Sequence, residues 1–314
     1  MLRLSILMKI ILMNNISLIN FYDIVEYTSA FIFNVPFIYK PNKKFMAMLL
    51  GFWDGDGNFD IGEQKQYNKK TKSLVKSTIR IRLASNIHVR DLPLLEYFQR
   101  LRHQKVIGVG KISTMSAREQ VRIIFAATKK DLMTVILPLI KSYNLQFLTS
   151  QRVKLFALLN YSLENNIVHW DNVLIEKLDF IATPSSDLIN LDFFADWLVG
   201  FTIAEGSFGI KGDGSAFYQI CQTGEDNLDL LKAACLLITG REAYPMKADS
   251  VDSYQLSLRS KVDIQKVVDF FSSPNNHPLY SYKLSQYNLW LTALKSSKRY
   301  SHIKYSNEIK KLDE

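Results

Sequence analysis

One apolar, glycine-containing stretch of this sequence occurs twice. Residues 49–57 read Leu-Leu-Gly-Phe-Trp-Asp-Gly-Asp-Gly, and residues 198–206 read Leu-Val-Gly-Phe-Thr-Ile-Ala-Glu-Gly. Both copies have glycine at the third place, phenylalanine at the fourth, an acid at the eighth and glycine at the ninth. Self-similarity between two distant segments indicates two related modules on one chain, so the fold has to contain a pair of equivalent elements.

Each copy predicts a buried helix with one smooth face. The apolar residues that lead into the copies, from Phe45 and from Phe194, are typical of a helix that is covered on most sides. The third and seventh residues of both copies are small, and a spacing of four places them on one face. Two such faces allow two helices to pack closely. The ninth-place glycine is expected to end each helix in the left-handed conformation.

Close packing of the two helices brings two acids together. Asp56 and Glu205 hold the eighth place and are expected at adjacent ends of the helix pair. Adjacent carboxylates repel each other, and one of them tends to stay protonated. A hard divalent cation removes this repulsion and prefers oxygen ligands. The stretch therefore predicts a two-carboxylate metal site, although a purely structural seam between two helices would use the same small residues.

Length and charge limit the classes of partner. The chain has 314 residues, enough for two ordinary domains. Its net charge of +9 favours a polyanion such as nucleic acid, or an acidic membrane surface. The apolar segment at residues 4–13 is too short to span a bilayer, so no membrane partner is expected. The 2 cysteines are too few for a disulfide scaffold.

Hydrophobic periodicity predicts the same order of elements after both copies. Around Arg80 and Arg82, apolar and cationic residues alternate, which indicates a strand with one apolar and one basic face. The order is helix, two strands, helix, two strands and closing helices. In the first module (residues 44–161) strands are predicted at 58–63, 77–88, 108–112 and 120–126, and helices at 91–100, 131–142 and 149–161. In the second (residues 191–305) strands are predicted at 207–211, 217–222 and within 243–258, and helices at 226–238, from 263 and from 284.

Three segments lie outside the two modules. Residues 1–43 form an N-terminal extension, residues 162–190 a polar linker, and residues 306–314 a basic tail. The linker contains Asn165-Asn166 and Thr183-Pro184-Ser185-Ser186, which are typical of loops.

The paired motif resembles that of the LAGLIDADG homing endonucleases and their intron-maturase relatives, and the resemblance covers roughly residues 44–305. It implies an α+β fold of two pseudo-symmetric αββαββα modules, each a curved antiparallel four-stranded sheet backed by helices. It also implies a monomeric, metal-dependent endonuclease that cuts both strands of a long DNA site and promotes mobility of its host intron. The alternative is a maturase that helps group I intron RNA to splice. A third interpretation is a DNA-binding relic without activity.

The resemblance assigns the metal and the residues around it. Mg²⁺, or Mn²⁺ in its place, is expected at Asp56 and Glu205, with the preceding Gly55 and Ala204 as further contacts. Gln222 matches a family position that orients water.

The same resemblance assigns a basic residue near each scissile phosphate. Lys283 matches it in the second module, and the equal spacing of residues 131–151 and 263–283 aligns Lys283 with Gln151. An amide supplies no charge, and Arg152 is expected to point elsewhere on its helix. One DNA strand is therefore expected to be cut more slowly than the other.

Antiparallel ribbons fit the major groove of B-DNA and can contact base edges there, which is how the family is expected to bind double-stranded DNA. Side chains on the polar strand faces are the candidate base contacts, and lysines near the first hairpin tip are candidate phosphate contacts. The base contacts are Arg80, Arg82, Lys211, Tyr218 and Gln219, and the phosphate contacts are Lys65, Lys69, Lys70, Lys72 and Lys76.

The location is also inferred from resemblance. Two-repeat members with Arg-Tyr near the C-terminus, here Arg299-Tyr300, look like fungal and protist mitochondrial intron proteins. The many Ile, Asn, Lys and Tyr residues suit an AT-rich organelle genome. We therefore expect an organelle-encoded mitochondrial protein.

Overall fold

The computed structural model describes residues 41–100, 111–115, 119–172, 180–242, 244–248 and 252–305. Most of the predicted N-terminal extension, the predicted basic tail and residues 108–110 of the second hairpin lie outside the described residues. The division of the chain into extension, modules, linker and tail stays a prediction.

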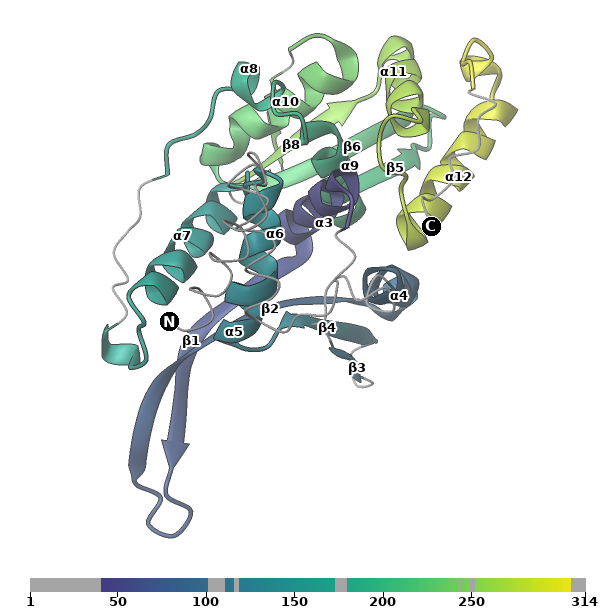
Figure 1. The fold of residues 1–314 in the computed structure, drawn as a ribbon. Coiled ribbons are helices and arrows are strands. Elements are labelled where there is room, and N and C mark those ends of the chain that lie inside the picture. Colours follow the sequence, from purple (N-terminus) through teal and green to yellow (C-terminus); the bar gives the residue numbers. More distant parts are fainter. Residues whose placement is uncertain are drawn as a thin grey trace, which may run out of the picture.

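Two antiparallel sheets lie on either side of a central pair of helices (Figure 1). In the described chain each sheet has four strands, in the orders β1-β2-β4-β3 and β5-β6-β8-β7. The same order of strands in both sheets confirms the predicted α+β fold of two related modules.

The elements of the first module follow the predicted order. They are α3 (Lys43–Asp56), β1 (Gly57–Tyr67), β2 (Leu74–His88), the 3-10 helix η1 (Val89–Asp91), α4 (Leu92–Arg100), β3 (Lys111–Met115), β4 (Gln120–Ala126), α5 (Lys129–Asp131), the π-helix η3 (Leu132–Ile136), α6 (Leu137–Ser142) and α7 (Ser150–Glu164).

The second module repeats this order after the short elements η4 (Trp170–Asn172) and α8 (Ser185–Leu188). Its elements are α9 (Phe194–Glu205), β5 (Gly206–Ile210), β6 (Ala216–Thr223), η5 (Glu225–Asn227), α10 (Leu228–Thr239), β7 (Met246–Lys247), β8 (Ser253–Leu258), α11 (Lys261–Ser272), α12 (Ser281–Ser296) and η6 (Lys298–Tyr300). None of the described helices combines the length and the hydropathy that a membrane crossing requires.

The motif helices α3 and α9 pack at their glycines. A Cβ atom on Gly51 would clash with the carbonyl oxygen of Trp197 and would lie only 2.9 Å from the backbone nitrogen of Phe201. A Cβ on Gly200 would meet the equivalent atoms of Met48 and Phe52 in the same way, also 2.9 Å from the nitrogen. The predicted close approach is therefore confirmed, and only glycine fits at these two places.

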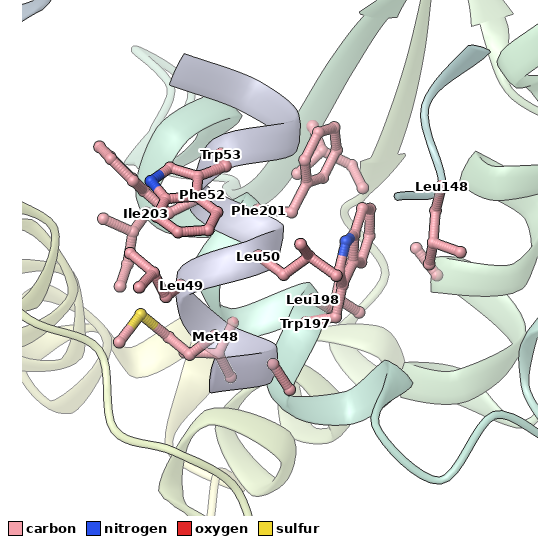
Figure 2. Packing of buried hydrophobic residues seen from close by; sticks show 14 of the residues in the cluster. Met48, Leu49, Leu50, Phe52, Trp53, Leu148, Trp197, Leu198, Phe201 and Ile203 are labelled. Carbon is pink, nitrogen blue, oxygen red and sulfur yellow. The ribbon is translucent and has the colours of Figure 1, made fainter. Parts of the chain in front are cut away.

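Large apolar side chains surround this contact. Those of α3 and α9 converge with Leu148, which precedes α7 (Figure 2). Burial of this set removes a large apolar area from water and supplies most of the packing energy of the centre. The labelled members from the two helices are Met48, Leu49, Leu50, Phe52, Trp53, Trp197, Leu198, Phe201 and Ile203.

The ninth-place glycines end the helices in a different way from the one predicted. Gly57 and Gly206 have φ values of −72° and −79°, so their backbone is extended rather than left-handed. A Cβ atom on Gly57 would lie 2.7 Å from the Cα atom of Trp53, and one on Gly206 would lie 2.5 Å from the Cγ2 atom of Thr202. Glycine is required because the strand leaves directly against the last helical turn.

The first hairpin is longer than the sequence suggested. β1 and β2 stay paired up to Tyr67 and Leu74, so the predicted polar tip of residues 64–76 is mostly strand. This hairpin projects beyond the rest of the molecule (Figure 1). The chain after α7 supports it, because Ile79 N donates to Val168 O at 2.9 Å and Thr78 forms a bridge with His169.

Candidate active site

The two acids hold equivalent places at the ends of the motif helices. Asp56 is the last residue of α3 and Glu205 is the last residue of α9, and both are partly buried. The helices are so close here that a Cβ atom on Gly55 would lie 3.4 Å from Oε1 of Glu205. The Glu205 carboxylate therefore sits against the end of the first module's motif helix.

This environment favours the protonated form of the acids. Burial, then Glu205 and Asp91, raise the pKa of Asp56 to about 7, while Lys283 and Arg152 lower it. Burial also raises the pKa of Glu205 against the effect of the same two cations. Two oxygen-bearing side chains that resist ionisation together are a donor set suited to a divalent cation.

One cation from each module flanks the acids. The Lys283 ammonium group donates to the carbonyl oxygen of Gly206. Arg152 donates from Nε to Trp53 O at 3.2 Å and from Nη2 to Gly55 O at 3.0 Å. The prediction that Arg152 points elsewhere is therefore wrong, because its guanidinium group binds the end of the motif helix.

The alignment of Gln151 with Lys283 is corrected by one residue. Lys283 is the third residue of α12 and Arg152 is the third residue of α7, whereas Gln151 is exposed. Thr128 and Ser260 cap the preceding helices in the same way, but Arg152 follows Thr128 by 24 residues and Lys283 follows Ser260 by 23.

The extra residue has a structural origin. The first module contains the π-helix η3, Leu132–Ile136, where the second has only regular α-helix. A π turn holds about one residue more than an α turn, so equal spacing along the sequence does not give equal places in space. The serines that start α7 and α12, Ser150 and Ser281, were the sequence signal for the correct alignment.

Strand register identifies the counterpart of Gln222. Gly57 pairs with Ser85, and Gly206 pairs with Ile220, so Gln222 corresponds to Ile87. Ile87 is buried and apolar and cannot orient a water molecule by hydrogen bonding. Gln222 stays a candidate for that role in the second module alone.

The nearby His88 is exposed, and its Nδ1 atom accepts from Arg90 N at 3.1 Å. This bond makes it the cap of η1.

A pocket of about 290 Å³ opens beside the acids. It is lined from both modules, which places two cations, two acids and the ends of two strands around a common space. Among its residues are Asp56, Asn86, Asp91, Gln120, Ala204 and Lys283. Ala204 therefore lies at the site, as does Gly55, but their role as metal contacts stays a prediction.

The sheet face opposite the helices, which we call the outer face, carries several predicted DNA contacts. Arg80 and Arg82 alternate with buried isoleucines and lie on this face. Arg80 forms an ion pair with Asp60 at 2.8 Å, so part of its charge is compensated within the sheet. Arg82 lies opposite Asp60 in the strand register.

The predicted phosphate contacts divide between two faces. Lys76 is an even number of residues from Arg80 along β2, so its side chain lies on the outer face. Lys65 is an even number of residues from buried Phe59 along β1, so its side chain lies on the opposite face. Lys65 also forms an ion pair with Glu63 at 3.0 Å, so part of its charge is compensated within the hairpin, and its role as a phosphate contact stays a prediction. Lys69, Lys70 and Lys72 are exposed in the turn between β1 and β2.

Tyr218 is not a DNA contact. Its side chain is buried, and its hydroxyl group lies 2.7 Å from Oγ1 of Thr202 on α9. Gln219 does lie on the outer face, where its Nε2 atom donates to Ser257 Oγ at 3.1 Å, and Lys211 is exposed in the turn after β5.

The outer face also holds polar residues that the sequence analysis missed. Alternation along each strand would have found them once the strand pairs were known, but the pairing itself is not readable from one sequence. They are Asn58, Asn86 and Arg122 in the first sheet and Gln255 and Arg259 beside the second.

Comparison with known proteins finds a match in the first module. Residues 49–160 match the family model for LAGLIDADG endonucleases. The match covers most of the first module, whose order of elements the second module repeats.

Solved structures of LAGLIDADG homing endonucleases have a similar fold. The LAGLIDADG homing endonuclease I-GzeII in complex with its DNA target is 18% identical and matches with a TM-score of 0.61, over 84% of this chain and 93% of that chain. I-LtrWI bound to target DNA is 17% identical, with a TM-score of 0.63 over 84% and 94%. I-SmaMI bound to uncleaved DNA in the presence of calcium ions is 19% identical, with a TM-score of 0.60 over 84% and 94%.

Proposed function

We propose that this protein is a site-specific homing endonuclease that makes a metal-dependent double-strand break in DNA at a long recognition site and thereby promotes the mobility of its host intron. The observation that carries this proposal is the pairing of Asp56 and Glu205 at the contact of the motif helices, with one cation beside each module's helix end. A DNA-binding relic would not need two carboxylates kept together at the cost of raised pKa values.

Asp56 and Glu205 would hold Mg²⁺, or Mn²⁺ in its place. The bound ion would stabilise charge on the phosphoryl oxygens and lower the pKa of an attacking water molecule. Lys283 and Arg152 supply fixed positive charge beside the acids, where negative charge develops on each scissile phosphate. Because the carbonyl oxygen of Gly55 already accepts from Arg152, the cation and the metal site share one helix end.

The two outer faces are suited to double-stranded DNA. Each is an antiparallel surface of the kind that enters the major groove, and Arg82 and Gln219 have the side chains that hydrogen-bond guanine and adenine. The solved relatives I-GzeII and I-LtrWI bind DNA targets with the same fold. Because one chain supplies both acids, we propose that the protein acts as a monomer, which light scattering on the DNA complex would test.

A maturase activity on group I intron RNA is the second candidate. A basic surface lies on α11 and the chain after η6, on the helix-covered side of the second sheet. It surrounds an open pocket of about 390 Å³ whose lining includes Lys261, Lys266, His302 and Lys304. Intron splicing that survives loss of Asp56 and Glu205 but not of these lysines would support this second activity.

For location, we propose a mitochondrial, organelle-encoded protein, on the basis of composition and Arg299-Tyr300. Tyr300 also has a structural role, since its hydroxyl group accepts from Ala216 N at 2.7 Å. Detection of the chain outside mitochondria only would contradict this proposal.

Cleavage of supercoiled plasmid that carries the intron-insertion sequence tests the main proposal. Asp56→Asn and Glu205→Gln should each reduce Mg²⁺-dependent cleavage by at least about 10³-fold while DNA affinity, measured with Ca²⁺, stays within a few-fold. Glu242→Gln, which neutralises an exposed acid of the second module, is the matched control and should cut normally. Undiminished cleavage by either acid variant would exclude these carboxylates from the reaction.

A further inference from the structure

The first turn of α12, the helix that carries Lys283, is hydrogen-bonded by a residue of the first module. Asp91 is the last residue of η1, directly after β2 of the first sheet. Its Oδ1 atom accepts from Ser281 Oγ at 3.1 Å and from Tyr282 N at 3.2 Å, at the start of α12. The first N–H groups of a helix have no partner within the helix. The Asp91 carboxylate of the first module supplies one for α12, the second module's helix that carries Lys283.

The same contact occurs in the opposite direction. Asn227 is the last residue of η5, which follows β6 after a single glycine, and is buried. Its Oδ1 atom accepts from Ser150 N at 2.9 Å, and its Nδ2 atom donates to Ser150 Oγ at 3.1 Å. Ser150 begins α7, whose third residue is Arg152. Nδ2 also donates to Thr223 O at 2.7 Å, which fixes the orientation of the amide.

Neighbouring side chains add contacts beside both of these caps, which join one module to the other. The guanidinium carbon of Arg90 lies 3.8 Å from the centre of the Tyr282 ring. On the other side, Lys154 forms an ion pair with Asp226 at 3.2 Å. α12 thus begins beside α4 of the first module (Figure 1).

The backbone at the start of α12 depends on this support. Ser281 has a φ of 55°, a left-handed value that is unfavourable for a residue with a side chain. Such a conformation persists where the surroundings hold it, and Asp91 bonds both the Ser281 side chain and the next backbone nitrogen. Asp91 therefore fixes the point from which the Lys283 side chain extends.

We propose that Asp91 and Asn227 are positioning residues that act across the module boundary: Asp91 places Lys283 of the second module, and Asn227 places Arg152 of the first. This inference rests on the proposed function. A cation that shifts by about 1 Å from its place can lower a rate by roughly 10²-fold, so loss of a cap in one module should slow the cut that depends on the other module's cation.

Strand-resolved cleavage of an end-labelled duplex tests this crossing. Lys283→Ala and Arg152→Ala first identify which strand depends on each cation. Asp91→Ala should then slow the Lys283-dependent strand by about 10–100-fold, and Asn227→Ala should slow the Arg152-dependent strand to a similar degree. Asp91→Asn keeps an oxygen acceptor and should restore the rate to within about threefold. Asp91→Ala combined with Lys283→Ala should be no slower than Lys283→Ala alone, because the two changes act on one contact.

Two matched variants separate positioning from general stability. Thr128→Ala and Ser260→Ala remove caps of comparable strength from α5 and α11, which carry no active-site cation. They should lower the melting temperature without changing the ratio of the two strand rates.

Hydrogen exchange of the Tyr282 and Ser150 amides gives a readout that does not need activity, and each should exchange faster when its cap is removed. Wild-type protein that fails to cut would contradict the proposed function. Wild-type protein that cuts while Asp91→Ala slows the Arg152-dependent strand, or both strands equally, would overturn the crossed positioning.

Discussion

The two modules have equivalent acids and cations at the contact of the motif helices, but their first hairpins differ in length. Both have an acid at the end of the motif helix and a cation at the third residue of a later helix. Their first hairpins differ, with strands of 11 and 15 residues in the first module and 5 and 8 in the second. At roughly 3.3 Å per residue, β1 spans about 36 Å and β5 about 17 Å. The part that would perform chemistry is thus constrained by contact between the modules, whereas the part that would contact DNA outside the centre is free to change length.

The motif helices also differ at their sixth place. Asp54 is buried and accepts hydrogen bonds from Leu148 N, from the nitrogen and hydroxyl of Thr149 and from Trp197 Nε1, at 2.7 to 3.1 Å. The second module has the apolar Ile203 there. The sixth place of the first motif helix is therefore tied through polar bonds to both α9 and the start of α7, whereas the sixth place of the second is filled by an apolar side chain.

Outside the two acids, the largest effect on the cleavage rate is expected from removal of either cation. Arg152→Ala and Lys283→Ala should each slow one strand by about 10²–10³-fold, on opposite strands, because each removes one fixed charge from the transition state. Gln151→Ala is the matched control and should stay within about twofold, since Gln151 is exposed.

The corrected alignment also changes the expected course of the wild-type reaction. With a cation on both sides, nicked plasmid should not accumulate before linear product in a time course. A long-lived nicked phase that Gln151→Lys shortens would instead favour the alignment by equal spacing.

Features set by residues close together in the sequence could be predicted, whereas features set by contacts between distant segments could not. The motif helices, the acids at their ends and the outer-face position of Arg82 follow from local spacing and alternation, and the duplication doubled the signal. Tyr218 was misassigned because tyrosine suits both a groove and a core. Ala216, Tyr218 and Ile220 are every second residue along β6 and all are buried, and this alternation correctly predicts a buried side chain for Tyr218.

Features that depend on packing could not be predicted. The π-helix η3 shifts the alignment of Arg152 by one residue, and its sequence does not differ visibly from that of an α-helix. The crossed caps need the three-dimensional contact of η1 with α12 and of η5 with α7, which no spacing along the chain reveals.

The difference in hairpin length should appear in the salt dependence of DNA binding. Each phosphate contact contributes about 0.9 to the slope of log affinity against log salt. Replacing Lys69, Lys70 and Lys72 by alanine should lower the slope by about 3 and weaken binding by roughly 10–100-fold at moderate salt. Lys211→Ala at the shorter tip should lower it by about 1. Equal slopes for the two tips would mean that the long hairpin does not follow the DNA.

The acids should make cleavage sensitive to pH. Because burial raises the pKa of Asp56 to about 7, this carboxyl group is mostly protonated at pH 6 and mostly ionised at pH 8. Only the ionised form can bind a divalent cation, so at limiting Mg²⁺ the rate should rise about tenfold between these values.

The flanking cation should shift this pH profile. Lys283 lowers the pKa of Asp56, so Lys283→Ala should move the midpoint to higher pH. A profile that is flat from pH 6 to 8 in both proteins would contradict an Asp56 that titrates in this range.

The smallest expected effects concern stability, where Asp54 and Asp56 should respond in opposite directions. Folded Asp56 keeps its proton up to about pH 7, whereas the unfolded chain loses it near the ordinary value of 3.8. The folded state therefore binds more protons between these values, so the free energy of unfolding falls as pH rises through that range and stays lower above it. Without metal, Asp56→Asn should raise the free energy of unfolding at pH 8, by about 1.4 kcal/mol for each unit by which the folded pKa exceeds the unfolded one, and hardly at all at pH 4.

Asp54→Asn should instead destabilise the protein. Burial raises the pKa of Asp54 to about 6, but its oxygens accept four hydrogen bonds that tie three segments together. An amide would turn N–H groups toward donors and leave at least one of them without an acceptor, at about 1–3 kcal/mol. Urea unfolding of the two variants at pH 4 and pH 8 checks both signs, and added Mg²⁺ should stabilise wild type but not Asp56→Asn. If both variants were destabilised at pH 8, Asp56 would be a structural acceptor like Asp54, and the two modules would be less alike at their centre than their helices are.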